Sequence, residues 1–132
     1  MKTKFCFLTL IFLALACKSN PVADNNSQTV TFIGKWLWTE TSGGFAGMIL
    51  RPSANQRDII QFTADSNFYT FGNDTLIRST HYSIRKGNLI DTLRWEDMPG
   101  YRQVIRVLTK DSLLLCDPGE DGFNWSYIKI LQ

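Results

Sequence analysis

The chain has 132 residues, with 14 Lys and Arg, 12 Asp and Glu and a single His, for a formal net charge of +2 at pH 7. Two of the 14 basic residues, Lys2 and Lys4, lie in the first four positions, so the rest of the chain has 12 basic against 12 acidic residues. This balance argues against nucleic acid and against an acidic membrane surface as partners, because both bind clustered positive charge. The length suits one domain with a single core.

The N-terminus has the layout of a secretory signal peptide. A basic segment, residues 1–4, precedes an apolar run over residues 5–16 that ends in small side chains. This is the order of n-region, h-region of roughly 7–15 residues and cleavage site. The run is too short to span a bilayer core, which takes roughly 20 residues. We therefore assign residues 1–16 to a cleaved signal peptide.

The residues around this cleavage site, Ala14, Leu15, Ala16 and Cys17, resemble a bacterial lipobox. The resemblance implies cleavage between Ala16 and Cys17 and acylation of Cys17 by three chains, palmitate among them. Two chains already give stable anchoring, because each buried methylene contributes about 0.8 kcal/mol. The alternative is an ordinary signal peptide in which Cys17 is incidental. Residues 18–20 lack the Asp that often follows the lipidated Cys in inner-membrane lipoproteins, which favours the outer membrane of a Gram-negative cell envelope.

Residues 18–29 are polar and almost free of large apolar side chains. Such a segment cannot bury enough surface to offset the entropy of ordering. We expect residues 17–29 to be a flexible tether. A coil of this length would hold its two ends roughly 20 Å apart. Residues 30–132 are expected to be the folded domain. Because Cys6 lies in the signal peptide, Cys116 is then alone in the domain, and no internal disulfide is possible.

From residue 30 onward the chain reads as a succession of short strands and no helical period appears. Strands are expected at residues 35–41, 57–63, 68–71, 76–85, 89–95, 102–108, 112–116 and 123–130. About eight strands separated by Gly, Pro, Asn and Asp turns at this spacing predict an all-β barrel or sandwich.

Residues 42–56 follow the first expected strand and are longer than the usual hairpin loop of 2–5 residues. This length favours a functional loop over a plain connection. An equally good reading is an extra edge strand at residues 48–50.

Gly34, Lys35 and Trp36 form a G-x-W sequence at the start of the first strand, and Tyr127, Ile128 and Lys129 lie near the end of the last one. Together they resemble the opening and close of lipocalin-like domains in envelope lipoproteins of the Bacteroidota. The resemblance implies a small antiparallel up-and-down barrel, monomeric, with Trp36 as a plug at its floor. Lys129 stands where the family often has an Arg that stacks over this Trp.

The residues that could support metal or nucleophilic chemistry are isolated in the sequence. His81 is the only His, and zinc would want further His or Cys partners. Cys116 follows three leucines and reads as a small buried hydrophobe. Asp117, Glu120 and Asp121 share one loop, but ordinary turn chemistry explains them better than calcium. We expect no metal and no cofactor.

No catalytic motif points to an enzyme. Acid–base chemistry would need a cleft that brings together Glu40, Glu96 or Asp97, and sequence cannot show one. We therefore expect a protein that is not an enzyme.

Aromatic side chains on the expected strands are the feature that most suggests a ligand, because they suit flat or apolar molecules. The candidate ligand-binding residues are Trp38, Phe68, Tyr82, Trp95 and Trp125. The alternative is that these side chains simply fill the barrel, since eight strands enclose little spare volume.

Two hypotheses of function follow. In the first, a lipid-anchored barrel binds a small hydrophobic molecule in the envelope. In the second, a filled barrel acts through its surface as an interaction or inhibitor module. Both have the membrane as a partner through the N-terminal lipid, and neither involves nucleic acid.

Overall fold

A computed structural model describes residues 30–131. The expected signal peptide (residues 1–16), its cleavage site at Ala16 and Cys17, and the tether (residues 17–29) lie outside the described residues. Within residues 30–131, no helix is long and apolar enough to cross a membrane. All the strands described below have their pairing partners inside this range.

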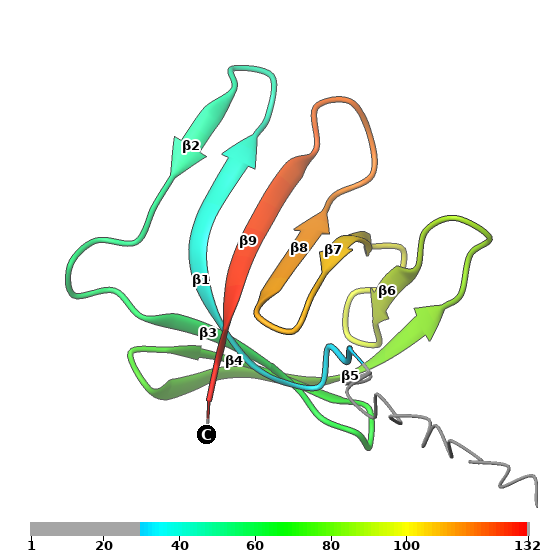
Figure 1. Ribbon diagram of the computed structural model, residues 1–132, viewed down its shortest axis with the longest axis horizontal. Coiled ribbons are helices and arrows are strands. Elements are labelled where there is room, and N and C mark those ends of the chain that lie inside the picture. The colour runs from blue at the N-terminus through cyan, green and yellow to red at the C-terminus, as the bar shows by residue number, and fades with distance from the viewer. Residues whose placement is uncertain (1–29, 132) are drawn as a thin grey trace, which may run out of the picture.

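The described residues form nine strands, and every pairing between them is antiparallel. The strands are β1 (Gly34–Gly43), β2 (Met48–Leu50), β3 (Asp58–Phe62), β4 (Asn67–Gly72), β5 (Thr75–Arg85), β6 (Thr92–Trp95), β7 (Arg102–Leu108), β8 (Ser112–Cys116) and β9 (Phe123–Ile130). Pairing runs from β1 to β3 and then from each strand to the next, and β9 returns to pair with β1. Eight strands thus close into an up-and-down barrel, with β2 added at the edge of β1 (Figure 1). The expected small lipocalin-like barrel is confirmed.

The two ends of the barrel differ. We call the end where β1 begins and β9 finishes the closed end, and the end where β1 finishes and β9 begins the open end. In Figure 1, β3 and β4 cross beneath β1 and β9 at a steep angle, as the strand tilt of a small barrel requires. The centre is packed by a cluster of buried side chains: Trp36, Ile60, Phe62, Phe68, Tyr82, Leu93, Trp95, Leu113, Leu115 and Tyr127.

A β-bulge in β1 decides which of its side chains face inward. The pairing with β9 shifts between Trp38 and Glu40, so that Thr39 is the extra residue. A bulge interrupts the alternation of faces, and residues three apart can then share one face. Trp38 and Thr41 do so, since the indole Nε1 of Trp38 donates to Thr41 Oγ1 at 2.8 Å. A second bulge, in β5, leaves Ile77 between the partners of Thr70 and Phe71.

One strand is shorter than predicted. A strand was expected over residues 89–95, but β6 begins at Thr92, and the Leu89 side chain is 95% exposed. Asp91 explains the difference, because its carboxylate accepts hydrogen bonds from Lys86 Nζ at 2.5 Å and from the Gly87 amide at 3.4 Å. These contacts hold residues 86–91 in a turn.

Residues 42–56 contain the edge strand that was one of their two readings. Thr41, Ser42 and Gly43 of β1 pair with Leu50, Ile49 and Met48 of β2. The remainder of the segment connects β2 to β3 beside the open end, where Leu50 and Gln56 line a pocket.

Candidate functional site

The closed end is plugged by Trp36 and covered by Lys129. Trp36 is fully buried, and its Nε1 donates to the carbonyl oxygen of Phe32 at 2.7 Å. Lys129 Nζ lies 4.9 Å from the centroid of the Trp36 ring and donates to the Thr31 carbonyl at 3.2 Å. The structure therefore brings together the two residues predicted for the barrel floor.

Gly34 explains why a glycine opens the G-x-W sequence. Its φ is +126°, a conformation that side chains rarely adopt, and a Cβ placed there would lie 3.1 Å from Lys129 Cε. The missing side chain lets the Lys129 stem cross β1 on its way to Trp36. The contact between Lys129 and Trp36 therefore has a structural role, which is to plug the closed end.

Three of the five candidate ligand-binding residues belong to the packed core. The rings of Phe62 and Phe68 have centroids 5.0 Å apart, Phe62 and Tyr82 5.2 Å, and Phe68 and Trp95 5.7 Å. The Tyr82 hydroxyl donates to the Thr63 carbonyl at 2.8 Å. These contacts fill the barrel between Phe62, Phe68 and Tyr82, as in the filled-barrel reading, although Tyr82 and Trp95 also line an open pocket of about 730 Å³ between β5 and the loop after β6.

The other two candidates, Trp38 and Trp125, line a pocket of about 330 Å³ at the open end. They share its lining with apolar groups from four further strands, β2 to β5, among them Ile60, Phe71 and Ile77. Ligand pockets typically measure roughly 300–1,000 Å³, so this one suits a small molecule. The bulges in β1 and β5 help to form it, because they shift the positions of Thr41 and Ile77, which line the pocket.

The pocket also contains polar groups that sequence reasoning missed. Asp58, at the start of β3, accepts a hydrogen bond on Oδ2 from Gln56 Nε2 at 2.6 Å, and both line the pocket. Tyr127 lines it too, and burial raises the pKa of its hydroxyl, which stays neutral. Within residues 30–131, Nε1 of Trp125 is buried without a hydrogen-bond partner. No sequence motif could have found Asp58, because an Asp that begins a strand looks like a turn residue.

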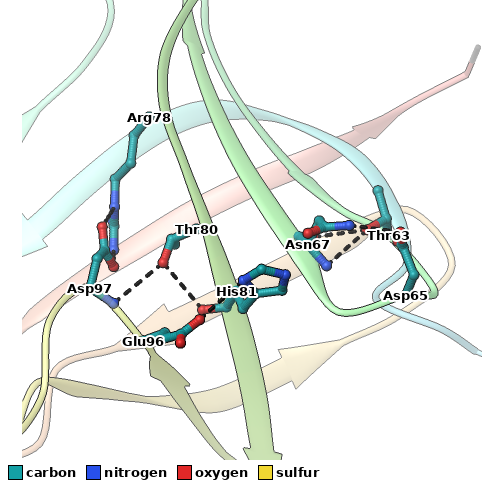
Figure 2. Close-up of polar contacts among 8 residues, drawn as sticks. All are labelled: Thr63, Asp65, Asn67, Arg78, Thr80, His81, Glu96 and Asp97. Carbon is teal, nitrogen blue, oxygen red and sulfur yellow. Dashed lines mark hydrogen bonds and ion pairs between the residues drawn. The ribbon is translucent and has the colours of Figure 1, made fainter.

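Beside β5, a polar network closes the side of the barrel next to Trp95. Arg78 donates to both carboxylate oxygens of Asp97, at 2.7 and 2.6 Å, and the Asp97 amide donates to Thr80 Oγ1 at 3.3 Å (Figure 2). The Arg78 guanidinium lies 5.5 Å from the Phe68 ring centroid and 5.9 Å from that of Trp95. The hydrogen bonds from Arg78 hold the pKa of Asp97 down at about 2.

The three carboxylates considered for acid–base chemistry are engaged separately. Glu40 pairs with Arg51, Asp97 with Arg78, and Glu96 Oε2 lies 3.0 Å from His81 Nδ1 (Figure 2). The His81 side chain is 64% exposed, on the outer face of β5. Each of the three carboxylates therefore has a partner of its own, which is an arginine for Glu40 and Asp97 and the His81 imidazole for Glu96.

The remaining sequence candidates have local partners. Cys116 is buried and free of any disulfide. Asp117 accepts hydrogen bonds from the Tyr101 hydroxyl at 2.6 Å and from Gln103 Nε2 at 2.9 Å, so it ties its loop to β7. Among residues 30–131, no three His, Cys, Asp or Glu residues are grouped so as to hold a metal ion.

The structure thus shows a closed β-barrel with a packed centre, a plug of Trp36 and Lys129 at one end and a pocket with apolar walls at the other. Comparisons with models of protein families, with curated proteins and with solved structures found no match for this chain. A proposal for the function of this protein therefore rests on its fold and on the pocket at the open end.

Proposed function

We propose that this protein binds a small hydrophobic molecule in the pocket at the open end of its barrel. The observation that carries the proposal is the 330 Å³ cavity with Trp38 and Trp125 in its walls. Aromatic walls give a large apolar contact area and favour flat or apolar ligands. The role is one of binding or transport, with no catalytic step.

We further propose that the barrel is held at a membrane of the cell envelope by lipid on Cys17, and that it is a lipocalin-like lipoprotein of the outer membrane. The support is the Ala14 to Cys17 sequence, the preceding apolar run and the G-x-W sequence at Gly34 to Trp36. Phe32 packs next to Trp36 at the closed end. A tether entering there would leave the pocket facing away from the anchor.

A neutral apolar dye, N-phenyl-1-naphthylamine, tests the binding proposal. The barrel from residue 18 onward, purified without detergent, should enhance the dye emission with a saturable isotherm. Thr70→Phe places a large side chain in the lining and should abolish the signal. Ser79→Phe adds the same side chain to an exposed position on the outer face of β5 and should preserve it. A folded wild-type protein that gives no enhancement would refute the proposal.

The alternative is an interaction module, and a second observation favours it. Apolar side chains are exposed around the open end on the β1–β2 and β4–β5 hairpins: Phe45, Met48, Ile49, Leu50, Leu76 and Ile77. Phe45 is 95% and Ile77 70% exposed. Exposed apolar groups that gather in one region often mark a protein contact. Phe45→Ser leaves the pocket lining intact. It should weaken the binding of a protein partner and leave the binding of the dye unchanged.

A further inference from the structure

The charge in the lining of the pocket is negative. Among its described lining residues, Asp58 is the one carboxylate, and no Lys, Arg or His is present. Asp58 lies two residues from the buried Ile60 on β3, which is about 6.6 Å along a strand. The carboxylate therefore stands nearer the open end, and the apolar walls extend from it toward the core.

No neighbouring cation neutralises Asp58. Its partner is the uncharged amide of Gln56, which uses Oδ2 alone. The arginines nearest in the fold have other partners: Arg51 pairs with Glu40, Arg57 with Asp74, and Arg78 with Asp97. Lys35, like these arginines, has a contact with another group, because its Nζ lies 6.0 Å from the centroid of the Phe71 ring. Oxygen Oδ1 of Asp58 makes no hydrogen bond within the described part of the chain.

The aromatic walls, like the carboxylate of Asp58, attract positive charge. The face of an indole or phenyl ring is electronegative and attracts cations, most strongly for Trp. Trp38, Trp125 and Phe71 supply such rings in the same lining as Asp58. A cation beside Asp58 would also remain near solvent at the open end, so its loss of hydration would be partial.

We infer that the ligand is a small apolar amine, with its ammonium group on Asp58 and its hydrocarbon body between Trp38 and Trp125. This inference rests on the proposed function and narrows it to a class of ligand. An ammonium donates to Oδ1, while the body covers the apolar walls around Ile60. An apolar acid would meet the Asp58 charge and be rejected.

Two probes with the same phenylbutyl body, one with a charged and one with a neutral head group, test the inference: 4-phenylbutylamine and 4-phenylbutan-1-ol. Isothermal titration calorimetry at pH 7 on the barrel from residue 18 onward should give about tenfold tighter binding of the amine, as a charge-assisted hydrogen bond implies. In Asp58→Asn the two affinities should become about equal. Asp111→Asn removes the same charge from an exposed residue outside the lining and should keep the preference.

The outcomes separate this inference from the proposal beneath it. Equal binding of amine and alcohol to the wild type, or an amine preference that survives Asp58→Asn, would overturn the amine assignment and leave the apolar carrier standing. The same holds if the neutral dye binds and the amine does not. Failure of all three molecules to bind a folded protein would overturn the carrier as well.

Discussion

The indole nitrogen of Trp38 donates a hydrogen bond of 2.8 Å to the hydroxyl of Thr41, three residues further along the same strand. In a regular strand, residues three apart face opposite sides of the sheet. The bulge at Thr39 places both on the inner face, and Thr39 Oγ1 itself donates to the Ser126 carbonyl at 3.0 Å. The wall of the pocket therefore depends on an irregularity of β1.

Replacing Thr41 with Val should show how much this bond contributes. The change keeps the shape but removes the acceptor, leaving Trp38 Nε1 unpaired, and we expect a loss of about 1–2 kcal/mol in unfolding free energy. Urea denaturation measures it. Thr75→Val, at an exposed position, should change stability by less than about 0.5 kcal/mol. Equal effects at both positions would contradict the role given to Thr41.

Gly34→Ala should destabilise the barrel through the closed end. The new Cβ meets both an unfavourable φ and the Lys129 stem at 3.1 Å, so we expect a loss of about 1–3 kcal/mol in denaturation experiments. Gly119 has a φ of +118° with open space around it. Gly119→Ala therefore reports backbone strain alone and should have the smaller effect. If the two losses are equal, contact with Lys129 contributes nothing.

The Arg78–Asp97 ion pair should make the stability of the folded protein depend on pH in the acidic range. The folded-state pKa of Asp97 is about 2, below its usual value of 3.8. The stabilisation is therefore fully present above pH 4 and is lost as the pH falls toward 2. The difference in Tm between wild type and Asp97→Asn should be constant from pH 5 to 8 and shrink below pH 4. A difference that grows on acidification would contradict this assignment.

Core and pocket aromatic residues should respond differently to substitution. Phe68→Leu should lower the unfolding free energy by roughly 1–2 kcal/mol and leave dye affinity nearly unchanged, because Phe68 packs between Phe62 and Trp95. Trp125→Leu removes part of the pocket wall and should weaken dye binding several-fold. Denaturation and dye titration of both variants provide the check. Weaker dye binding in Phe68→Leu at unchanged stability would place the ligand in the core.

Anchoring through Cys17 is tested in a Gram-negative host fed an alkyne analogue of palmitate. The wild-type chain should be labelled and recovered with membranes, and Cys17→Ser should abolish the label. Cys116→Ser, at the buried cysteine of β8, should remain labelled. A wild-type chain that is exported without the label would leave the ordinary signal peptide as the correct reading, and persistent labelling of Cys17→Ser would exclude Cys17 as the site of acylation.

The sequence by itself determined the class of fold and most of its strands. Alternation of apolar and polar side chains, interrupted by turn residues, has the period of a strand, and this local pattern needs no tertiary information. It failed at residues 89–91, because the hydrogen bonds of Asp91 to Lys86 and Gly87 compete with strand pairing. The resemblance of residues 34–36 and 127–129 to the opening and close of lipocalin-like domains likewise located Trp36 and Lys129, which meet across one pair of strands.

Only the tertiary structure decided which aromatic residues fill the barrel and which line a pocket. Trp38 and Trp95 look alike in sequence, since each lies on a strand among alternating neighbours. Both point into the barrel, but Trp95 lies against Phe68 in the packed layer, whereas Trp38 lies nearer the open end. There the bulges in β1 and β5 rearrange the inward positions beyond Trp38, and a bulge has no reliable local signature. The place of Asp58 in the pocket arises in the same way, from closure of β1 on β9 and from the register of β3 beside it.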